Sequence, residues 1–535
     1  MQKLLLSGIA TLFAAVGFAQ SNTSTVNQDG TSQTASVSQA GSSLTSTVSQ
    51  VGPGSNSANS GISIQIGTGH QLTINQNNSS YNRAGIWQEN TSGPGSNTAT
   101  INQNGNSGNG ATALRPNDTR TTTPNALLGN WAGVKQIGSG NNGTINQNDA
   151  GTVNNFAETW QWGTGNSATT NQNGGAKDNK AEVFQGNDKR ESSPDAEGAT
   201  DVNVTGNTAS IDQSGSVLNT AKVKQFSNTN TASVEQLGAF SSSNTAFIQQ
   251  GATGASSAVA GGNTALIQQN GNTSQGNSAT ALQTGTGGLA QVIQVNNSNN
   301  NIGFVQQIAG TGSSGYVRQI GDAQSNSGTI IQTGDFHNAL VEQGTGSSSN
   351  FGTINQGIAG VTLSDHATAY IGQVSGASSG TATINQNQAS VGSYNKAFVL
   401  QTGVTTGNLA TVTQENSYNT AGLLQTGAGS NTATFGQTGG YNVINGPASV
   451  NSGFFGSLDA ARQDGNGNKM TVTQNAGTFG TMTTSNTATL SQTGTSNTLS
   501  VDQLITTAGG SNLSTINQNG MMNSVTVTQV NGVTP

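Results

Sequence analysis

The sequence predicts an all-β protein: a parallel β-solenoid of about 18 two-strand coils, whose strands form two facing parallel sheets with loop insertions. Two observations lead to this prediction. The first is a seven-residue unit, Asn-x-Ala-x-aliphatic-x-Gln, which recurs along nearly the whole chain. The second is the spacing of the unit, because successive glutamines are often 11 or 12 residues apart, as in Gln213, Gln225 and Gln236. A fixed period of this size is typical of stacked repeats.

The four fixed positions of the unit identify it as a strand. They share one parity, and alternate side chains of a strand point to the same face, whereas a helix would scatter them around its circumference. We therefore expect these residues to point inward and the residues between them to point outward. In the clearest three copies the expected inward residues are Asn207, Ala209, Ile211, Gln213, Asn219, Ala221, Val223, Gln225, Asn230, Ala232, Val234 and Gln236.

Identical inward residues in every copy favour parallel stacking of like on like over the alternative of antiparallel hairpins. Successive coils would then place Asn over Asn and Gln over Gln about 4.8 Å apart. Each amide carries a donor and an acceptor, so stacked copies can satisfy one another and avoid a cost of about 1–3 kcal/mol per orphaned group. Further members of the expected ladder are Asn419, Gln425, Asn431, Gln437, Asn486, Gln492, Asn497, Gln503, Asn512, Gln518, Asn523 and Gln529.

The segments between the copies are rich in Gly, Asn, Ser and Thr, which tolerate the tight reversals of turns. Longer interruptions of the repeat are expected near 106–129, 186–200, 357–369 and 440–467. Insertions of a solenoid leave from its turns without disturbing the stack. We interpret these four as tolerated spacers rather than binding surfaces.

Residues 1–19 are expected to be a secretory signal peptide, and the repeat array is expected to occupy 20–535. Lys3 is followed by an apolar run, and Gly17 and Ala19 fit the small-residue rule for cleavage. A spanning helix needs a longer apolar stretch, and no second run of that length follows. The sequence therefore predicts an exported protein at the cell surface, with no membrane anchor of its own.

Composition excludes several other classes. Only 7% of the 535 residues are charged and the net charge is −7, which argues against a nucleic-acid binder with basic stripes. The 31% of hydrophobic residues would be low for a globular chain, but their fixed positions are not typical of disorder. There is no cysteine, so no disulfide framework contributes to stability.

No catalytic, cofactor-binding or metal-binding residue is predicted. The G-x-G-x-x-G matches at 138–143 and 310–315 and the G-x-S-x-G match at 376–380 are expected by chance in a chain with 75 glycines, and none opens a helix. The only histidines, His70, His337 and His366, share no metal-ligand spacing. Asp and Glu are scattered, which does not favour an enzyme.

The four tryptophans are the remaining candidates for a binding surface. Those at outward positions could stack on sugar rings, but we favour the simpler interpretation that they cover neighbouring loops. These residues are Trp87, Trp131, Trp160 and Trp162.

The spacing Gln-x-Gly-x-x-Asn-x-Ala-x-x-x-Gln resembles the curlin repeat of the curli fibre subunits. Gln225 to Gln236 and Gln518 to Gln529 show Gln, Asn and Gln at the matching offsets, and Gln492 to Leu499 carries the glycine as well. The resemblance covers nearly the whole mature chain. It implies an exported subunit of extracellular amyloid fibres in a biofilm matrix. It also implies a dedicated outer-membrane export pore and a cell-surface nucleator as partners. The chain has several times more repeats than a typical curli subunit, and its links are longer.

Two further functions stay open at this point. A monomeric repeat adhesin would use the solenoid to bind a surface or matrix ligand. An ice-binding solenoid would need an unbroken outward threonine ladder, which residues such as Phe247 and Lys222 interrupt. The leading hypothesis remains self-assembly into fibres, because strand edges without caps are best satisfied by another copy of the same chain.

Overall fold

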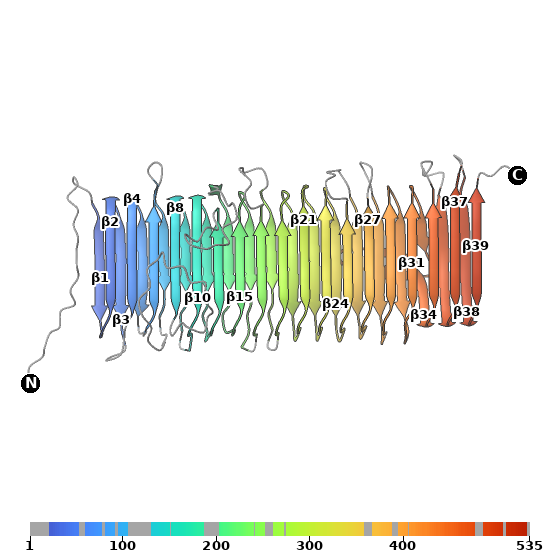
Figure 1. Ribbon diagram of the computed structural model, residues 1–535, viewed down its shortest axis with the longest axis horizontal. Coiled ribbons are helices and arrows are strands. Elements are labelled where there is room, and N and C mark those ends of the chain that lie inside the picture. The colour runs from blue at the N-terminus through green and yellow to red at the C-terminus, as the bar shows by residue number, and fades with distance from the viewer. Residues whose placement is uncertain are drawn as a thin grey trace, which may run out of the picture. The chain divides into compact units, whose positions relative to one another are not determined.

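A computed structural model describes residues 21–52, 59–77, 81–90, 95–104, 130–149, 151–186, 203–239, 241–251, 261–271, 274–357, 366–387, 394–404, 406–476, 485–506 and 510–531. The chain forms two compact units, 1–261 (unit 1) and 262–535 (unit 2), each of which is described by itself. Strands and turns make up the described residues (Figure 1). None of these residues belongs to a helix with the length and apolar character needed to cross a membrane.

Unit 1, blue to green in Figure 1, contains two parallel sheets. Sheet A1 consists of β1 (Thr23–Asp29), β3 (Thr45–Val51), β5 (Gln71–Asn77), β7 (Thr98–Asn102), β9 (Asn142–Asn146), β11 (Ser167–Asn171), β14 (Thr208–Asp212) and β16 (Thr231–Glu235). Sheet B1 consists of β2 (Thr34–Ser42), β4 (Ser60–Thr68), β6 (Arg83–Glu89), β8 (Trp131–Ser139), β10 (Phe156–Thr164), β12 (Lys180–Gln185), β13 (Val204–Thr205), β15 (Thr220–Gln225) and β17 (Thr245–Gln250).

Unit 2 repeats this plan. Sheet A2 consists of β18 (Thr264–Gln268), β20 (Leu289–Val295), β22 (Ser314–Ile320), β24 (Asn338–Gly344), β26 (Thr368–Val374), β28 (Lys396–Thr402), β30 (Thr420–Thr426), β32 (Val443–Asn445), β34 (Ser457–Asn466), β36 (Asn486–Thr495) and β38 (Asn512–Met521). Sheet B2 consists of β19 (Ser278–Gln283), β21 (Ile302–Ile308), β23 (Ser327–Thr333), β25 (Phe351–Gln356), β27 (Thr381–Asn387), β29 (Leu409–Glu415), β31 (Thr432–Thr438), β35 (Lys469–Asn475), β37 (Thr498–Ile505) and β39 (Ser524–Asn531).

The predicted parallel solenoid is confirmed, with a number of turns close to the prediction. The chain alternates between the two sheets of a unit, so most strands pair with the next strand but one. In β14 and β16, Ala209 is paired with Ala232 and Ile211 with Val234, so like residues lie over like residues. A one-residue slip would turn every inward side chain outward, which is why the repeated apolar pattern fixes the register.

The thin core lies between the facing sheets of each unit. In β14 the inward side chains of Ala209 and Ile211 are buried, whereas the outward ones of Ser210 and Asp212 are half-buried. The same alternation runs through most strands of both units. Side chains as small as Ala and Val fill this space because the two facing sheets approach closely and share the layer.

Neighbouring coils of the solenoid require glycine where their backbones pass closest to one another, near the end of β36. Gly494 has φ +113°, and a Cβ at this position would overlap the carbonyl oxygen of Gly520 in the next turn. An L-residue with a side chain is therefore excluded on two counts, by the backbone angle and by the close approach. This glycine is the one that the repeat Gln-x-Gly places two residues after Gln492.

The expected interruptions have different outcomes. The signal peptide 1–19, all of 106–129 and most of 186–200 lie outside the described residues. Of 357–369, Thr368 and Ala369 belong to β26, because they continue the inward pattern of that strand. The insertion 440–467 is not a plain loop: its ends contribute β32 and part of β34 to sheet A2.

Between these ends the insertion forms the one departure from parallel pairing among the described strands. Strand β33 (Ala448–Asn451) pairs antiparallel with residues 457–460 of β34. We call 448–460 the outer hairpin. Its Val450 and Ala460 pack against outward side chains of sheet A2, which form an apolar stripe of Tyr316, Leu340, Tyr370 and Phe398.

Candidate functional site

The most continuous feature of both units is a file of inward glutamines in each sheet. The Nε2 of each glutamine donates to the Oε1 of the glutamine one turn later, as Gln172 does to Gln213 and Gln213 to Gln236, at 2.9 and 2.8 Å. In sheet B1 the same bond joins Gln185 to Gln225 at 2.8 Å. Among the described residues, the bonds of the four files have the same direction along the chain.

The second amide proton of each glutamine crosses to the facing sheet. The Nε2 of Gln213 donates to the carbonyl oxygen of Lys180 at 3.1 Å, and the Nε2 of Gln225 donates to that of Thr208 at 2.9 Å. Both protons of a fully buried amide are thereby satisfied, one along the stack and one across it. The glutamine files therefore hold the turns together and also tie the two sheets of a unit to each other.

The inward asparagines stack as expected but bond differently. The backbone N–H of Asn230 donates to the Oδ1 of Asn207 at 2.8 Å, and Asn244 donates in the same way to Asn219. Amide-to-amide bonds of the kind expected occur only at some turns, for example from Asn512 to Asn486 at 2.9 Å. The short asparagine side chain reaches the backbone of the next turn rather than its amide.

Consequently, not every ladder amide is satisfied. The buried Nδ2 groups of Asn207 and Asn219 have no hydrogen-bond partner among the described residues. The other expected ladder residues lie inward as predicted. Ala209, Ala221, Ala232, Ile211, Val223 and Val234 are buried, as are Asn419, Gln425, Asn431, Gln437, Asn486, Gln492, Asn497 and Gln503, whereas Asn512 and Gln518 are buried to a lesser degree and Asn523 and Gln529 are half-buried in the last turns.

Two histidines occupy asparagine positions of the ladder, which the sequence pattern did not reveal. The Nδ1 of His70 accepts the backbone N–H of Asn97 at 3.1 Å, as an asparagine Oδ1 would. The Nε2 of His337 lies 3.0 Å from the carbonyl oxygen of Thr333. Burial lowers the pKa of both imidazoles, that of His337 to about 4, so both rings are neutral at pH 7. The sequence signal for this role was the position of both histidines directly before a strand.

The terminal strands expose the ends of this stack. Strand β1 pairs with β3 alone among the described strands, and all of its residues are exposed, including the inward Val26 at 40%. At the other end of the sequence, β39 pairs with β37 alone among the described strands, and its side chains alternate between exposed and half-buried. Among the described residues, the outer edges of these two strands carry backbone groups without a strand partner, and such edges readily pair with another strand.

The outer face of sheet B1 carries a cluster of aromatic and charged side chains. Lys135 of β8 projects outward, and its Nζ lies 5.4, 5.3 and 5.2 Å from the ring centres of Trp87, Trp160 and Trp162. Only 8% of Lys135 is exposed. A cation over indole faces is favourable by about 0.5–2 kcal/mol for each significant contact.

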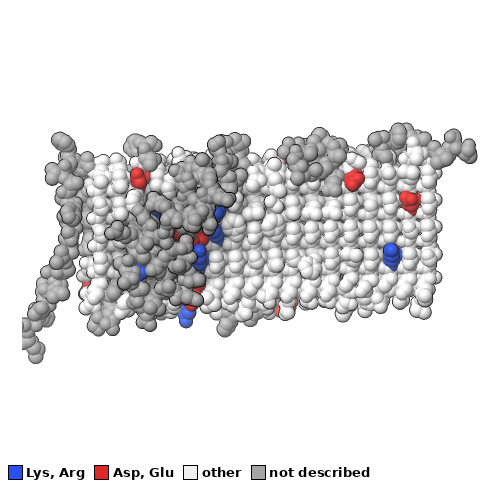
Figure 2. Space-filling view, in the orientation of Figure 1, with Lys and Arg blue, Asp and Glu red and all other residues white. Residues whose placement is uncertain are grey.

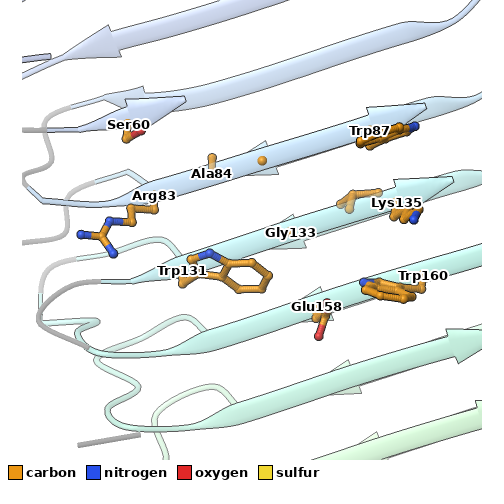
Figure 3. Close-up of a pocket in the computed structure, with 11 residues that line it drawn as sticks. Ser60, Arg83, Ala84, Trp87, Trp131, Gly133, Lys135, Glu158 and Trp160 are labelled. Atoms are coloured by element: carbon orange, nitrogen blue, oxygen red, sulfur yellow. The ribbon is translucent and has the colours of Figure 1, made fainter. Parts of the chain in front are cut away.

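A second row of this cluster lies beside the first. Trp131 stacks on Phe156 with ring centres 4.5 Å apart, and the Nζ of Lys180 lies 5.8 Å from the centre of Phe156. Between the two rows, the backbone at Gly133 leaves space that the Trp131 ring partly covers. Figure 3 shows the resulting hollow, which is lined by Ser60, Arg83, Ala84, Gly85, Trp87, Trp131, Gly133, Val134, Lys135, Glu158 and Trp160.

Charged residues are concentrated on this part of unit 1. Figure 2 shows blue and red residues gathered over β10 to β15 and few elsewhere on the same face. Glu182, whose side chain is 3% exposed, lies 3.1 Å from the Nζ of Lys180 and 3.7 Å from that of Lys222. Lys180 and Glu182 both belong to β12, and the register pairs Glu182 with Lys222 of β15, so the ion pairs join two neighbouring strands.

The sequence did not indicate that the tryptophans would share a face with Lys135 and Glu158. An alignment of the repeats does indicate this cluster, because these residues occupy outward positions in consecutive copies. The chance motifs at 138–143 and 310–315 lie where β8 and β21 end, and strands rather than helices follow them. Among the described residues, no three His, Asp or Glu side chains are grouped in a way that could hold a metal ion.

Comparison with known proteins adds no assignment. No protein-family model matches the chain, and no curated protein matches it.

Proposed function

We propose that the chain is a structural subunit of extracellular, curli-like amyloid fibres, which grow when the end of one solenoid stacks on the end of another. The observation that carries this proposal is the glutamine file. It runs in one direction through each sheet and reaches strands whose edges are unpaired among the described residues. Repeats that stack like on like within a chain can continue the same stacking between chains.

The first glutamine of sheet A1 and the last glutamine of sheet A2 are complementary. Gln28 of β1 donates to Gln50, so its Oε1 is directed away from the stack. Gln518 of β38 accepts from Gln492, and its Nε2 also donates to the carbonyl oxygen of Thr498, which leaves one amide proton for a further turn. Placing Gln28 of a second copy after Gln518 would continue the file with an unchanged direction.

The second sheet supports the same junction. Gln39 of β2 is the first glutamine of the sheet B1 file, and Gln529 of β39 is the last of the sheet B2 file. A copy that continues Gln518 with Gln28 would also continue Gln529 with Gln39. A head-to-tail contact of this kind does not close on itself, and therefore produces a fibre rather than a ring or a dimer.

The proposal includes export through a curlin-type outer-membrane pore and growth from a cell-surface nucleator, as the repeat resemblance implies. It includes no catalytic step. Fibre formation is tested with the mature chain from Gln20 onward. We expect fibres whose diffraction has a meridional reflection at about 4.7–4.8 Å. Soluble monomers that persist for days at high micromolar concentration would contradict the proposal.

A matched pair of variants tests the junction. Val26 points inward in β1 and is 40% exposed, so Val26→Asp places a charge where the next copy would bury it. Thr25→Asp adds the same charge to the outward face of the same strand. We expect Val26→Asp to slow fibre elongation about tenfold or more, because an unpaired buried charge is costly. Equal elongation rates for the two variants would exclude this junction.

A second candidate, a surface-binding solenoid that acts as a monomer, is favoured by the indole-lined hollow of unit 1. Indole faces together with Arg83 and Glu158 are side chains suited to sugar binding. The same variant separates the two functions. An adhesin with Val26→Asp would keep its binding to a polysaccharide surface, whereas a fibre subunit would lose the cohesion of its matrix.

A further inference from the structure

A file of aromatic rings follows the turns of unit 2. Each ring belongs to the residue directly before the inward ladder position of a sheet A2 strand, so each turn contributes one ring. The centres of neighbouring rings are 5.2, 4.9, 5.3 and 4.7 Å apart, and neighbouring planes are inclined by 29° or less. The members, in order, are Phe336, His366, Tyr394, Tyr418 and Tyr441.

The asparagine ladder sets the spacing of the three tyrosines. The backbone N–H of Asn419, which follows Tyr418, donates to the Oδ1 of Asn395 at 2.9 Å. The backbone N–H of Asn442, which follows Tyr441, donates to Asn419 in the same way at 3.1 Å. Tyr418 and Tyr441 also share a left-handed backbone, with φ 61° and 60°. Equal backbone angles on turns of fixed spacing hold the two rings parallel.

These tyrosines are accessible, unlike two others of the six in the chain. Tyr394 is 49% exposed, Tyr418 is 38% exposed and Tyr441 is half-buried. Tyr316 and Tyr370 are 9% and 3% exposed beneath the outer hairpin. Oxidants in solution therefore reach the stacked phenols of the turns but not the phenols of the apolar stripe.

We propose that this file is a site of oxidative modification, at which a haem peroxidase with hydrogen peroxide couples Tyr418 to Tyr441 as dityrosine. Each phenol gives one hydrogen atom to the oxidant, so two phenoxyl radicals form and one hydrogen peroxide becomes two waters. The radicals join through a new bond between ring carbons ortho to the oxygens. The hydrogens on those carbons then move to the oxygens, which restores both aromatic rings.

The ring geometry favours coupling of Tyr418 to Tyr441 over coupling of Tyr394 to Tyr418. The rings of Tyr418 and Tyr441 have centres 4.7 Å apart and planes inclined by 5°, against 5.3 Å and 29° for Tyr394 and Tyr418. Holding two reacting groups in contact replaces a slow bimolecular encounter with an intramolecular step. The product is a covalent bond between adjacent turns, which opposes their separation. It does not require that the chain forms fibres.

The experiment treats dilute, monomeric mature chain with a haem peroxidase and hydrogen peroxide. Dityrosine fluorescence measures the rate, and peptide mass mapping locates the bond through the loss of two hydrogens. We expect the linked peptides to contain Tyr418 and Tyr441. Tyr418→Phe keeps the ring stack but removes the central phenol, and we expect it to lower the initial rate about tenfold.

Tyr370→Phe is the matched control, because it removes one phenol that is buried outside the file. We expect it to leave the rate unchanged. Unfolding the chain in denaturant before oxidation should remove the preference for the Tyr418–Tyr441 pair. An equal rate for Tyr418→Phe and the unsubstituted chain would overturn the proposal. So would links that map mainly to Tyr81 or that form between molecules in proportion to protein concentration.

Discussion

The outer faces of sheets B1 and A2 depart from the plain polar exterior in different ways. On B1, the outward side chains of neighbouring strands form a cluster of indoles, lysines and glutamates around Lys135. On A2, they form an apolar stripe of Tyr316, Leu340, Tyr370 and Phe398, and the chain's own outer hairpin packs against it. Charge pairing and aromatic stacking stabilise the outer face of B1, whereas burial of apolar side chains stabilises the outer face of A2.

The interiors beneath these two faces are nevertheless the same. Gln213 in unit 1 and Gln425 in unit 2 make equivalent bonds to the next turn, both at 2.8 Å. The inward residues therefore determine the fold, and the outward residues are available for individual structures on each face. The stability of a unit should depend on both, and substitutions can separate the two contributions.

The largest expected effect is on the apolar stripe. Phe398 is fully buried between sheet A2 and the outer hairpin, so Phe398→Ala should cost about 3–5 kcal/mol locally. Hydrogen exchange at the amides of β28 and β33 measures this loss, because a repeat array opens in parts rather than as a whole. The control is Phe351→Ala, since Phe351 is 54% exposed on β25 and should change exchange by about 0.5 kcal/mol or less. Equal losses at both positions would show that the hairpin does not protect the stripe.

An intermediate effect is expected from the buried histidine of unit 2. The folded pKa of His337 is about 4, below the ordinary value of 6.5, so the unfolded chain binds the proton first as the pH falls. The stabilising contribution is complete above about pH 6.5 and is lost progressively down to about pH 4, by roughly 3 kcal/mol in total. We expect His337→Asn, which restores the usual ladder residue, to be less sensitive to acid over this window in hydrogen-exchange measurements of β24.

His70 provides the same test of acid sensitivity in unit 1. Burial lowers its pKa too, and its Nδ1 accepts the N–H of Asn97, so protonation would remove that acceptor. His70→Asn should therefore reduce acid sensitivity at β5 and β7 in the same direction. Acid sensitivity that is unchanged by either substitution would assign the pH dependence to the carboxylates.

The smallest expected effect is on the cluster of sheet B1. Lys135→Met keeps a long apolar side chain among Trp87, Trp160 and Trp162 but removes the charge from their ring faces. We expect a loss of about 1–2 kcal/mol and a shift of tryptophan emission. Lys469→Met, at an exposed outward position of β35, is the control and should change neither. If Lys135→Met left the stability unchanged, packing alone would maintain the cluster.

The interior was predictable from the sequence because it repeats. Asn207, Ala209, Ile211 and Gln213 recur at one parity, and a strand stacked in register is the arrangement that places all four inside. The role of asparagine was only partly predictable. Sequence spacing shows which residues stack, but not that the Oδ1 of Asn207 would accept a backbone N–H rather than an amide proton.

The exterior was harder to predict because it arises from residues in different turns. Tyr316, Leu340, Tyr370 and Phe398 occupy the same outward offset in consecutive copies of sheet A2, and such a row indicates that something covers it. The outer hairpin that covers it has no repeat pattern of its own, so its antiparallel pairing could not be read from periodicity. The tryptophan cluster of unit 1 likewise becomes visible only after the copies are aligned.

The uniform direction of the glutamine bonds has an electrical consequence. An amide has a dipole of about 3.5 D, and dipoles that are aligned along one axis add instead of cancelling. Each file therefore gives its unit a positive and a negative pole. Copies stacked head to tail would keep these dipoles parallel, so a filament would carry a net dipole along its axis and would orient in an applied electric field.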